Sequence, residues 1–84
     1  MITVRYFASI REKLNCAEES LQLPASVKSV EDLVKHLVQV HGALWAETLQ
    51  SASVLVAVNQ TVEKKNASIK DGDELAFFPP VTGG

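Results

Sequence analysis

The last eight residues, FFPPVTGG (residues 77–84), are the part of this sequence whose residue types could do chemistry. Pro79 and Pro80 fix φ at about −65° and remove two amide donors, so they end a strand and direct the following chain away from it. Residues 81–84 could then extend about 13 Å, which is long enough to enter a partner's cleft. Gly83 and Gly84 allow such an insertion, because glycine has no Cβ to block a narrow channel.

The functional group at the end of this segment is the α-carboxylate of Gly84, which has a reference pKa of about 3.3–3.7 and is ionised at neutral pH. A carboxylate is a poor electrophile, so it reacts only after it gains a better leaving group, as adenylation with ATP provides. The residues therefore indicate a protein whose terminus is activated by another enzyme. The competing interpretation of a terminal Gly-Gly is a frayed end or a processing remnant.

Two phenylalanines form a second candidate feature. Alternating apolar and polar residues predict strands over residues 2–6 and 74–78. The same alternation places Phe7 and Phe78 on the polar faces of these strands, where an aromatic residue is out of place. If the two strands are neighbours, the phenylalanines form one patch, and such patches mark partner sites. The alternative is two stray exposed aromatics, which are ordinary on protein surfaces.

One helix is predicted between these strands. Apolar residues recur with helical spacing from Val30 to Val38, and Ser29 precedes them as an N-cap. Gly42 follows where we expect a left-handed C-terminal cap. The single apolar stripe predicts that this helix packs one side onto the sheet. Shorter helical turns are expected over residues 9–14 and 44–49.

Three further strands complete the expected sheet. Residues 19–23 alternate and are expected to pair with the first strand, whereas the run VLVAV (residues 54–58) predicts a strand buried on both faces. Asn59-Gln60 suggests a turn into a short edge strand that begins at Thr61. Asp71-Gly72 is a strong turn signal before the last strand. The expected order is ββαβ(β)β.

Length and charge limit the function further. A chain of 84 residues allows one small domain, for which we take residues 1–80, followed by a flexible tail over residues 81–84. The net charge is −2 and the basic residues are scattered, which argues against nucleic-acid binding. No apolar run is long enough to span a bilayer and the first residues lack the apolar stretch of a signal peptide, so we expect a cytoplasmic protein without membrane contact.

The remaining reactive side chains give no catalytic or metal-binding pattern. The single cysteine, Cys16, has no nearby partner, and we interpret it as a loop or core residue. His36 and His41 lack a carboxylate or cysteine at matching spacing, so no metal site is predicted. Trp45 is interpreted as an anchor of the small core. No catalytic constellation is visible, and we expect no enzyme activity from this chain alone.

Three segments resemble the family of small, sulfur-carrying subunits of molybdopterin synthase: AVNQT (residues 57–61), DGDE (residues 71–74) and AFFPPVTGG (residues 76–84). The resemblance implies an α+β fold, the ubiquitin-like β-grasp. In this fold a mixed sheet of four to five strands is crossed by one main helix, and the first and last strands lie side by side. It would therefore place Phe7 and Phe78 together.

The resemblance also implies the chemistry. An E1-like enzyme would use ATP to adenylate Gly84, and sulfur transfer would convert it to a thiocarboxylate. The large synthase subunit, in a heterotetramer of two small and two large subunits, would then pass the sulfur to a cyclic pterin phosphate precursor of molybdopterin. This chain would itself bind no cofactor. Besides Gly83 and Gly84, the positions that match the family's partner-binding residues are Phe7, Arg11, Val62, Phe78, Pro79, Pro80, Val81 and Thr82.

Other functions remain open. A ubiquitin-like modifier would join Gly84 to lysine side chains through an isopeptide bond. A sulfur carrier of thiamine biosynthesis or transfer-RNA thiolation would share the terminal Gly-Gly, although the sequence FFPP points away from the thiamine carriers. A plain interaction module would work equally well without Gly83 and Gly84.

Overall fold

The computed structural model describes residues 1–80, which contain five strands and three helices. In chain order these elements are β1 (Ile2–Tyr6), α1 (Ala8–Leu14), β2 (Glu18–Leu21), α2 (Val30–His41), α3 (Ala43–Leu49), β3 (Leu55–Val58), β4 (Thr61–Glu63) and β5 (Glu74–Phe78). The predicted order of strands around one main helix is therefore confirmed. The two expected helical turns are α1 and α3.

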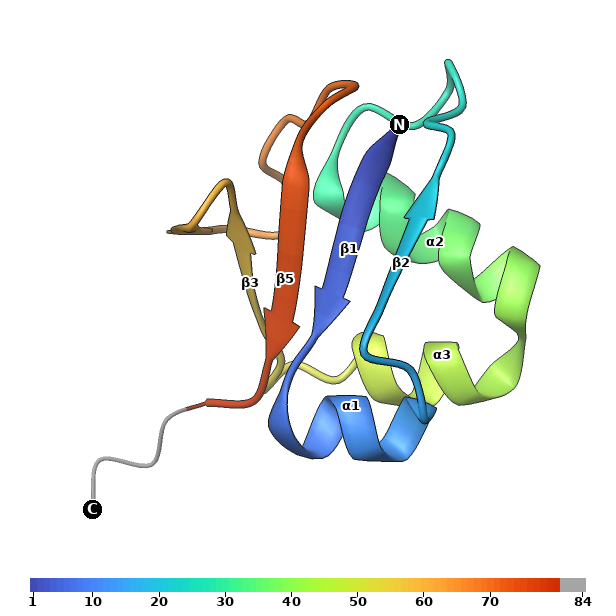
Figure 1. Ribbon diagram of the computed structural model, residues 1–84, viewed down its shortest axis with the longest axis vertical. Helices are drawn as coiled ribbons and strands as arrows, with labels where there is room; N and C mark the ends of the chain where they lie inside the picture. Colours follow the sequence, from blue (N-terminus) through green and yellow to red (C-terminus); the bar gives the residue numbers. More distant parts are fainter. Residues whose placement is uncertain (81–84) are drawn as a thin grey trace.

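The strands form one mixed sheet in the order β2-β1-β5-β3-β4. Strands β1 and β5, the first and last of the chain, run parallel, and the other neighbours are antiparallel. Figure 1 shows these two strands side by side at the centre of the sheet, with α2 crossing behind β1 and β2. The adjacency that the resemblance implied is thus confirmed.

The core lies between α2 and one face of the sheet. Alternate residues of β1 and β5 are almost completely buried, and α2 buries one stripe of its surface. The fully buried large side chains are Ile2, Val4, Tyr6, Val30, Leu33, Leu37, Leu49, Val56, Leu75 and Phe77. The other face of the sheet is not covered by α2, and this difference between the faces decides where a partner can bind.

The ends of α2 follow the sequence signals. The Ser29 side chain accepts a hydrogen bond from the Asp32 amide at 3.2 Å, which confirms the predicted N-cap. Gly42 ends the helix with φ 97° and ψ −160°. This positive φ suits glycine, but the ψ value lies outside the left-handed helical region, so the predicted cap type is wrong. Gly42 instead links two helices, because it ends α2 and also directly precedes the first residue of α3.

A polar network holds α2 and α3 against the sheet. The Tyr6 hydroxyl donates to the Glu19 carboxylate at 2.7 Å and accepts from the Trp45 indole at 3.1 Å. His41, the last residue of α2, lies 2.8 Å from the second Glu19 oxygen and stacks on Trp45. Trp45 is therefore a core anchor, as predicted, and also a hydrogen-bond donor.

At the end of the sheet where β5 begins, hydrogen bonds join the turn between β3 and β4 to the turn before β5. Asn59 and Gln60 both have positive φ, as the tight hairpin between β3 and β4 requires. The side-chain NH₂ of Asn59 donates to the Asp73 carboxylate at 3.0 Å, and the side-chain oxygen of Asn59 accepts from the backbone N–H of Glu74 at 3.0 Å. Asp73 is 5% exposed and also accepts from the Lys70 amide. The hairpin turn thus fixes the start of β5.

Two sequence predictions need correction. The second strand spans Glu18–Leu21 rather than residues 19–23. Strand β3 is buried on both faces only in part: Val56 and Ala57 are buried, but Leu55 at its start is 36% exposed. The run VLVAV contains no polar residue that would mark the open side, so periodicity alone could not identify it.

Candidate docking surface and chain end

The structure brings Phe7 and Phe78 to the same end of the sheet. Their preceding residues, Tyr6 and Phe77, are partners in the parallel pairing of β1 and β5. The Phe7 amide continues this ladder and donates to the Phe77 carbonyl at 3.1 Å. Phe7 has extended backbone angles and is 44% exposed, while Phe78 is half-buried. The phenylalanines therefore lie where the sequence analysis expected them.

Leu55 is a member of this surface that the sequence analysis missed. It is the direct partner of Phe78 in the antiparallel pairing of β3 and β5. Because side chains opposite each other in such a pair point to the same face, Leu55 lies beside Phe78 on the face away from α2. The signal that could have found it was the pairing itself, which places the start of β3 against the end of β5.

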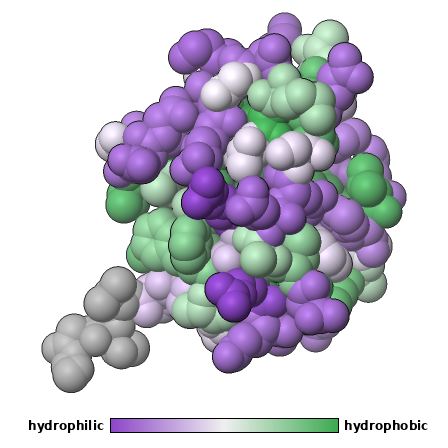
Figure 2. Space-filling model, in the orientation of Figure 1, coloured by the Kyte–Doolittle hydropathy of each residue, from purple (hydrophilic) through white to green (hydrophobic). Residues whose placement is uncertain are grey.

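Val62 extends the apolar surface to the edge of the sheet. It pairs with Ala57, which in turn pairs with Ala76 of β5. The Val62 side chain is 63% exposed. We call Phe7, Leu55, Val62 and Phe78 the open-face patch. Figure 2 looks onto this face and shows apolar surface gathered over the start of β3 and the end of β5.

Charged residues border the open-face patch. The Arg5 guanidinium lies 3.6 Å from the Glu74 carboxylate, and both side chains are partly exposed. Such a pair contributes little to stability, but it makes one margin of the patch polar. Arg11 is exposed on α1, one helical turn after Phe7, and lines a shallow hollow with Asn15 and Cys16. A partner that covers Phe7 would therefore find a cation nearby.

The chain leaves the sheet at Pro79 and Pro80, which follow directly after β5. Pro79 is half-buried and Pro80 is exposed. Figure 1 shows this segment turning away from the sheet, to the left of α1 in this view. The predicted functional residues Val81, Thr82, Gly83 and Gly84 lie outside the described residues.

Residues 1–80 contain no cluster of three or more His, Cys, Asp and Glu side chains that could hold a metal ion. Cys16 is half-buried in the loop before β2, where burial and the nearby Glu19 carboxylate raise the pKa of its thiol. A raised pKa disfavours the reactive thiolate. Within the same range, none of the helices is both long and apolar enough to cross a bilayer.

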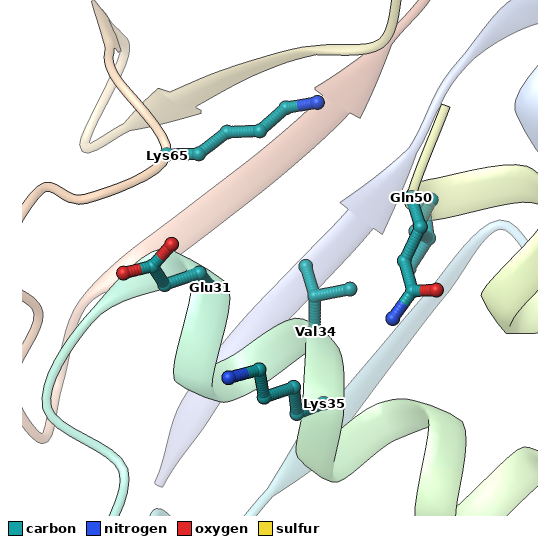
Figure 3. Close-up of a pocket in the computed structure, with 6 residues that line it drawn as sticks. Glu31, Val34, Lys35, Gln50 and Lys65 are labelled. Atoms are coloured by element: carbon teal, nitrogen blue, oxygen red, sulfur yellow. The ribbon is translucent and has the colours of Figure 1, made fainter. Parts of the chain in front are cut away.

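A cavity of about 170 Å³ lies on the helical side of the molecule, away from the open-face patch. Figure 3 shows Glu31, Val34 and Lys35 of α2 on one side of it, with Gln50 and Lys65 opposite. Lys65 is already engaged, because its ammonium donates to the Ser51 carbonyl at 3.0 Å. The lining of this cavity mixes lysines, a carboxylate and apolar side chains, so it does not favour one class of ligand.

Comparison with known proteins identifies the family of this chain. The ThiS family profile matches residues 4–84. The molybdopterin synthase sulfur carrier subunits of Haemophilus influenzae and Escherichia coli are 42% and 40% identical to this chain, and each alignment covers 100% of both proteins.

Solved structures agree with the fold. The complex of subunits 1 and 2 of molybdopterin-converting factor from Helicobacter pylori contains a chain with 25% identity and a TM-score of 0.65, covering 99% of this chain and 97% of that one. Small archaeal modifier protein 1 of H. volcanii has 25% identity and a TM-score of 0.75, over 95% of this chain and 97% of that one. Together with the mixed sheet crossed by α2, these likenesses show the ubiquitin-like β-grasp fold and confirm the predicted class.

Proposed function

This chain belongs to the ThiS family, and from that premise we propose that it is the sulfur carrier subunit of a molybdopterin synthase. The observation that carries the proposal is the similarity to two sulfur carrier subunits at 40–42% identity over the whole length of each protein. The open-face patch adds a physical reason, because an exposed apolar cluster beside the chain end suits a subunit that works inside a complex.

The proposed reaction takes place at Gly84. An E1-like enzyme transfers AMP from ATP to the carboxylate, and pyrophosphate leaves. A sulfide-level nucleophile such as hydrosulfide then attacks the glycyl carbonyl and displaces AMP, which produces a thiocarboxylate without a redox step. Its sulfur, a better nucleophile than oxygen, forms a C–S bond to a side-chain carbon of the cyclic pterin phosphate precursor, and an oxygen substituent of that carbon leaves as water. Another water molecule then cleaves the acyl–sulfur bond, which leaves the sulfur on the precursor and restores the carboxylate of Gly84. ATP is consumed by the activating enzyme, and this chain supplies the carboxylate of Gly84 but no cofactor.

In this proposal the open-face patch docks onto the large synthase subunit, with Arg11 at its margin. Residues 79–82 then lead the terminal glycines into the partner's active site. The H. pylori neighbour was solved together with its subunit 2, which supports an assembly of this kind. We propose a heterotetramer of two small and two large subunits for this chain. We also propose that the activating enzyme binds the same patch, because it must enclose the same tail.

Mass spectrometry of the C-terminal peptide tests the proposal. The protein is incubated with its adenylating enzyme, ATP and a sulfur donor, and the peptide containing Gly84 is analysed by fragmentation. The peptide is analysed rather than the intact chain because oxidation of Met1 or Cys16 adds nearly the same mass as the exchange of oxygen for sulfur. A mass gain confined to Gly84 is expected. An unchanged Gly84, with an enzyme proven active on another carrier, would refute sulfur loading.

A variant with one residue added after Gly84 is the matched control. It retains the fold but no longer presents a glycine carboxylate, so we expect no sulfur loading. Normal loading of this extended chain would contradict the terminal mechanism.

The likeness to a small archaeal modifier protein favours a second candidate, in which Gly84 forms isopeptide bonds with lysines of other proteins. The two functions share adenylation and differ in the nucleophile that follows. Covalent adducts that survive a denaturing gel and contain a Gly84–lysine linkage would establish conjugation. Sulfur-loaded chain without such adducts favours the carrier.

A further inference from the structure

A second cavity, of about 200 Å³, lies where the chain leaves the sheet. It is lined by Ser9 and Lys13 of α1, by Glu47 and Thr48 of α3, and by Pro79 and Pro80. We call it the tail-root pocket. Its volume exceeds that of one water molecule, about 30 Å³ in the liquid, so it has room for a side chain.

Thr48 is the unusual residue of this pocket. It is 4% exposed, and its hydroxyl oxygen is buried without a hydrogen-bond partner among the described residues. Buried polar groups in native proteins are nearly always paired, so an exception calls for an explanation. Threonine in a helix has two accessible χ1 rotamers, so rotation about its Cα–Cβ bond can change the direction in which the hydroxyl points. A group that enters the pocket could thus receive a hydrogen bond from Thr48.

The other polar groups of the pocket are mainly donors. Lys13 contributes an ammonium, and within residues 1–80 it makes no ion pair. Ser9 contributes a hydroxyl, and the Ser51 and Ser53 hydroxyls lie 3.0 Å apart, so one of their two protons is left to donate. Glu47 is the single carboxylate of the lining. This set fits an oxygen-rich acceptor better than a cation.

The pocket is continuous with the open-face patch. Ser9 follows Phe7 by two residues at the start of α1, and Pro79 directly follows Phe78. A protein that covers both phenylalanines and encloses the tail therefore also covers the mouth of this pocket. Interfaces of this kind combine an apolar centre with hydrogen bonds at the margin.

We propose that the tail-root pocket receives an Asp or Glu side chain of the large synthase subunit, which accepts hydrogen bonds from Thr48 and Lys13. The inference rests on the proposed function, because it assumes docking through the open-face patch. The pocket then acts as a polar anchor at the base of the tail, and Thr48 gains in the complex the partner that it lacks in the isolated chain.

The Thr48→Val variant tests this directly, because valine keeps the shape of threonine without the hydroxyl. In the isolated protein the substitution removes an unpaired buried polar group, so the midpoint of thermal unfolding should stay the same or rise. In the complex it removes a hydrogen bond, so the Kd for the purified large subunit should rise about five- to tenfold. Thr61→Val is the matched control, since Thr61 is exposed on β4 and does not line the pocket. It should change neither value.

Phe78→Asp, measured in the same titration, separates failure of the inference from failure of the proposed function. If Phe78→Asp weakens the complex but Thr48→Val leaves the Kd within twofold, the pocket is not a contact and the inference is overturned, while patch docking stands. If neither variant weakens the complex, patch docking itself is refuted, and the inference with it.

The charge of the occupant is tested by Lys13→Met and Glu47→Gln. A carboxylate in the pocket predicts that Lys13→Met weakens the complex and that Glu47→Gln leaves it unchanged or tightens it. The reverse pattern would show that a basic side chain enters, and would overturn the assignment of a carboxylate.

Discussion

Leu55 lies directly opposite Phe78 in the antiparallel pairing of β3 and β5, on the sheet face that α2 leaves uncovered. This pairing joins two residues 23 positions apart (78 − 55) into one apolar surface beside the chain end. Exposed apolar area of this kind does not stabilise the isolated chain. It contributes favourable free energy only when a partner covers it and removes it from water.

We predict that Leu55→Asp weakens binding of the large synthase subunit at least tenfold while leaving the fold intact. The side chain is partly exposed in the free protein, so a carboxylate there remains hydrated, whereas in the complex it would be buried without a counter-ion. Isothermal titration calorimetry gives the Kd, and circular dichroism checks the fold.

Val40→Asp is the matched control for this prediction. Val40 is 61% exposed on α2, on the other side of the molecule from the open-face patch. It should leave the Kd unchanged. Equal weakening by both substitutions would indicate a general effect of added charge, and undiminished binding by Leu55→Asp would remove Leu55 from the docking surface.

We predict that Tyr6→Phe lowers the free energy of unfolding by about 1–2 kcal/mol, because a buried hydroxyl that both donates and accepts is lost. The Trp45 indole and one Glu19 oxygen would be left without this partner. The thermal midpoint should fall by roughly 4–8 °C per kcal/mol, as is usual for a domain of this size. Chemical and thermal unfolding followed by circular dichroism measure both quantities. An unchanged stability would show that the network makes no net contribution.

The same residue gives a prediction for alkaline pH. Burial raises the pKa of Tyr6 well above the ordinary tyrosine value of about 10, and the nearby Glu19 carboxylate raises it further against the opposing hydrogen bond from Trp45. Since the unfolded state loses this proton first, the folded state holds more protons above pH of about 10, and stability falls as the pH rises beyond that value.

Tyr6 is the only tyrosine of the chain, so phenolate absorbance reports this residue alone. We expect no phenolate signal until the protein unfolds, with both changes at the same pH. A smooth titration near pH of about 10 in folded protein would contradict the buried environment of Tyr6.

Local signals in the sequence predicted most of the fold, and pairings between distant segments account for what they missed. Ser29 capped α2 as expected because an N-cap is recognised from its own residue and the next turn. Leu55 was missed because VLVAV has no polar residue to mark its open face. The contacts of Tyr6 with Glu19 and Trp45 bridge 13 and 39 residues, and no periodic pattern encodes such contacts.

In the candidate site, too, some residues were recognisable from local sequence and others only from the folded structure. Phe7 and Phe78 were identified because an aromatic residue interrupts a regular alternation, which is visible in each strand alone. The tail-root pocket was not identified, because it forms only where α1, α3 and the end of β5 meet, and because the unpaired state of Thr48 depends on that packing.

We predict that Asp73→Asn destabilises the protein by about 1–3 kcal/mol at neutral pH and flattens its loss of stability in acid. Burial alone would raise the pKa of Asp73, but hydrogen bonds from the Asn59 side chain and the Lys70 amide outweigh burial and hold the pKa below its ordinary value. The contribution of this carboxylate is therefore complete above the unfolded value of about 3.9 and is lost as the pH falls below it.

Urea unfolding at a series of pH values from about 2 to 7 measures this effect, with Asp71→Asn as the control. Asp71 is 73% exposed and pairs with the terminal ammonium of Met1, so its removal should change stability little at any pH. The carboxylate of Asp73, by contrast, ties the turn at Asn59 to the start of β5. If Asp73→Asn and wild type lose stability in parallel below pH of about 4, the tie between the two turns is not electrostatic, and the shape of the Asn59 hairpin alone must fix the start of the last strand.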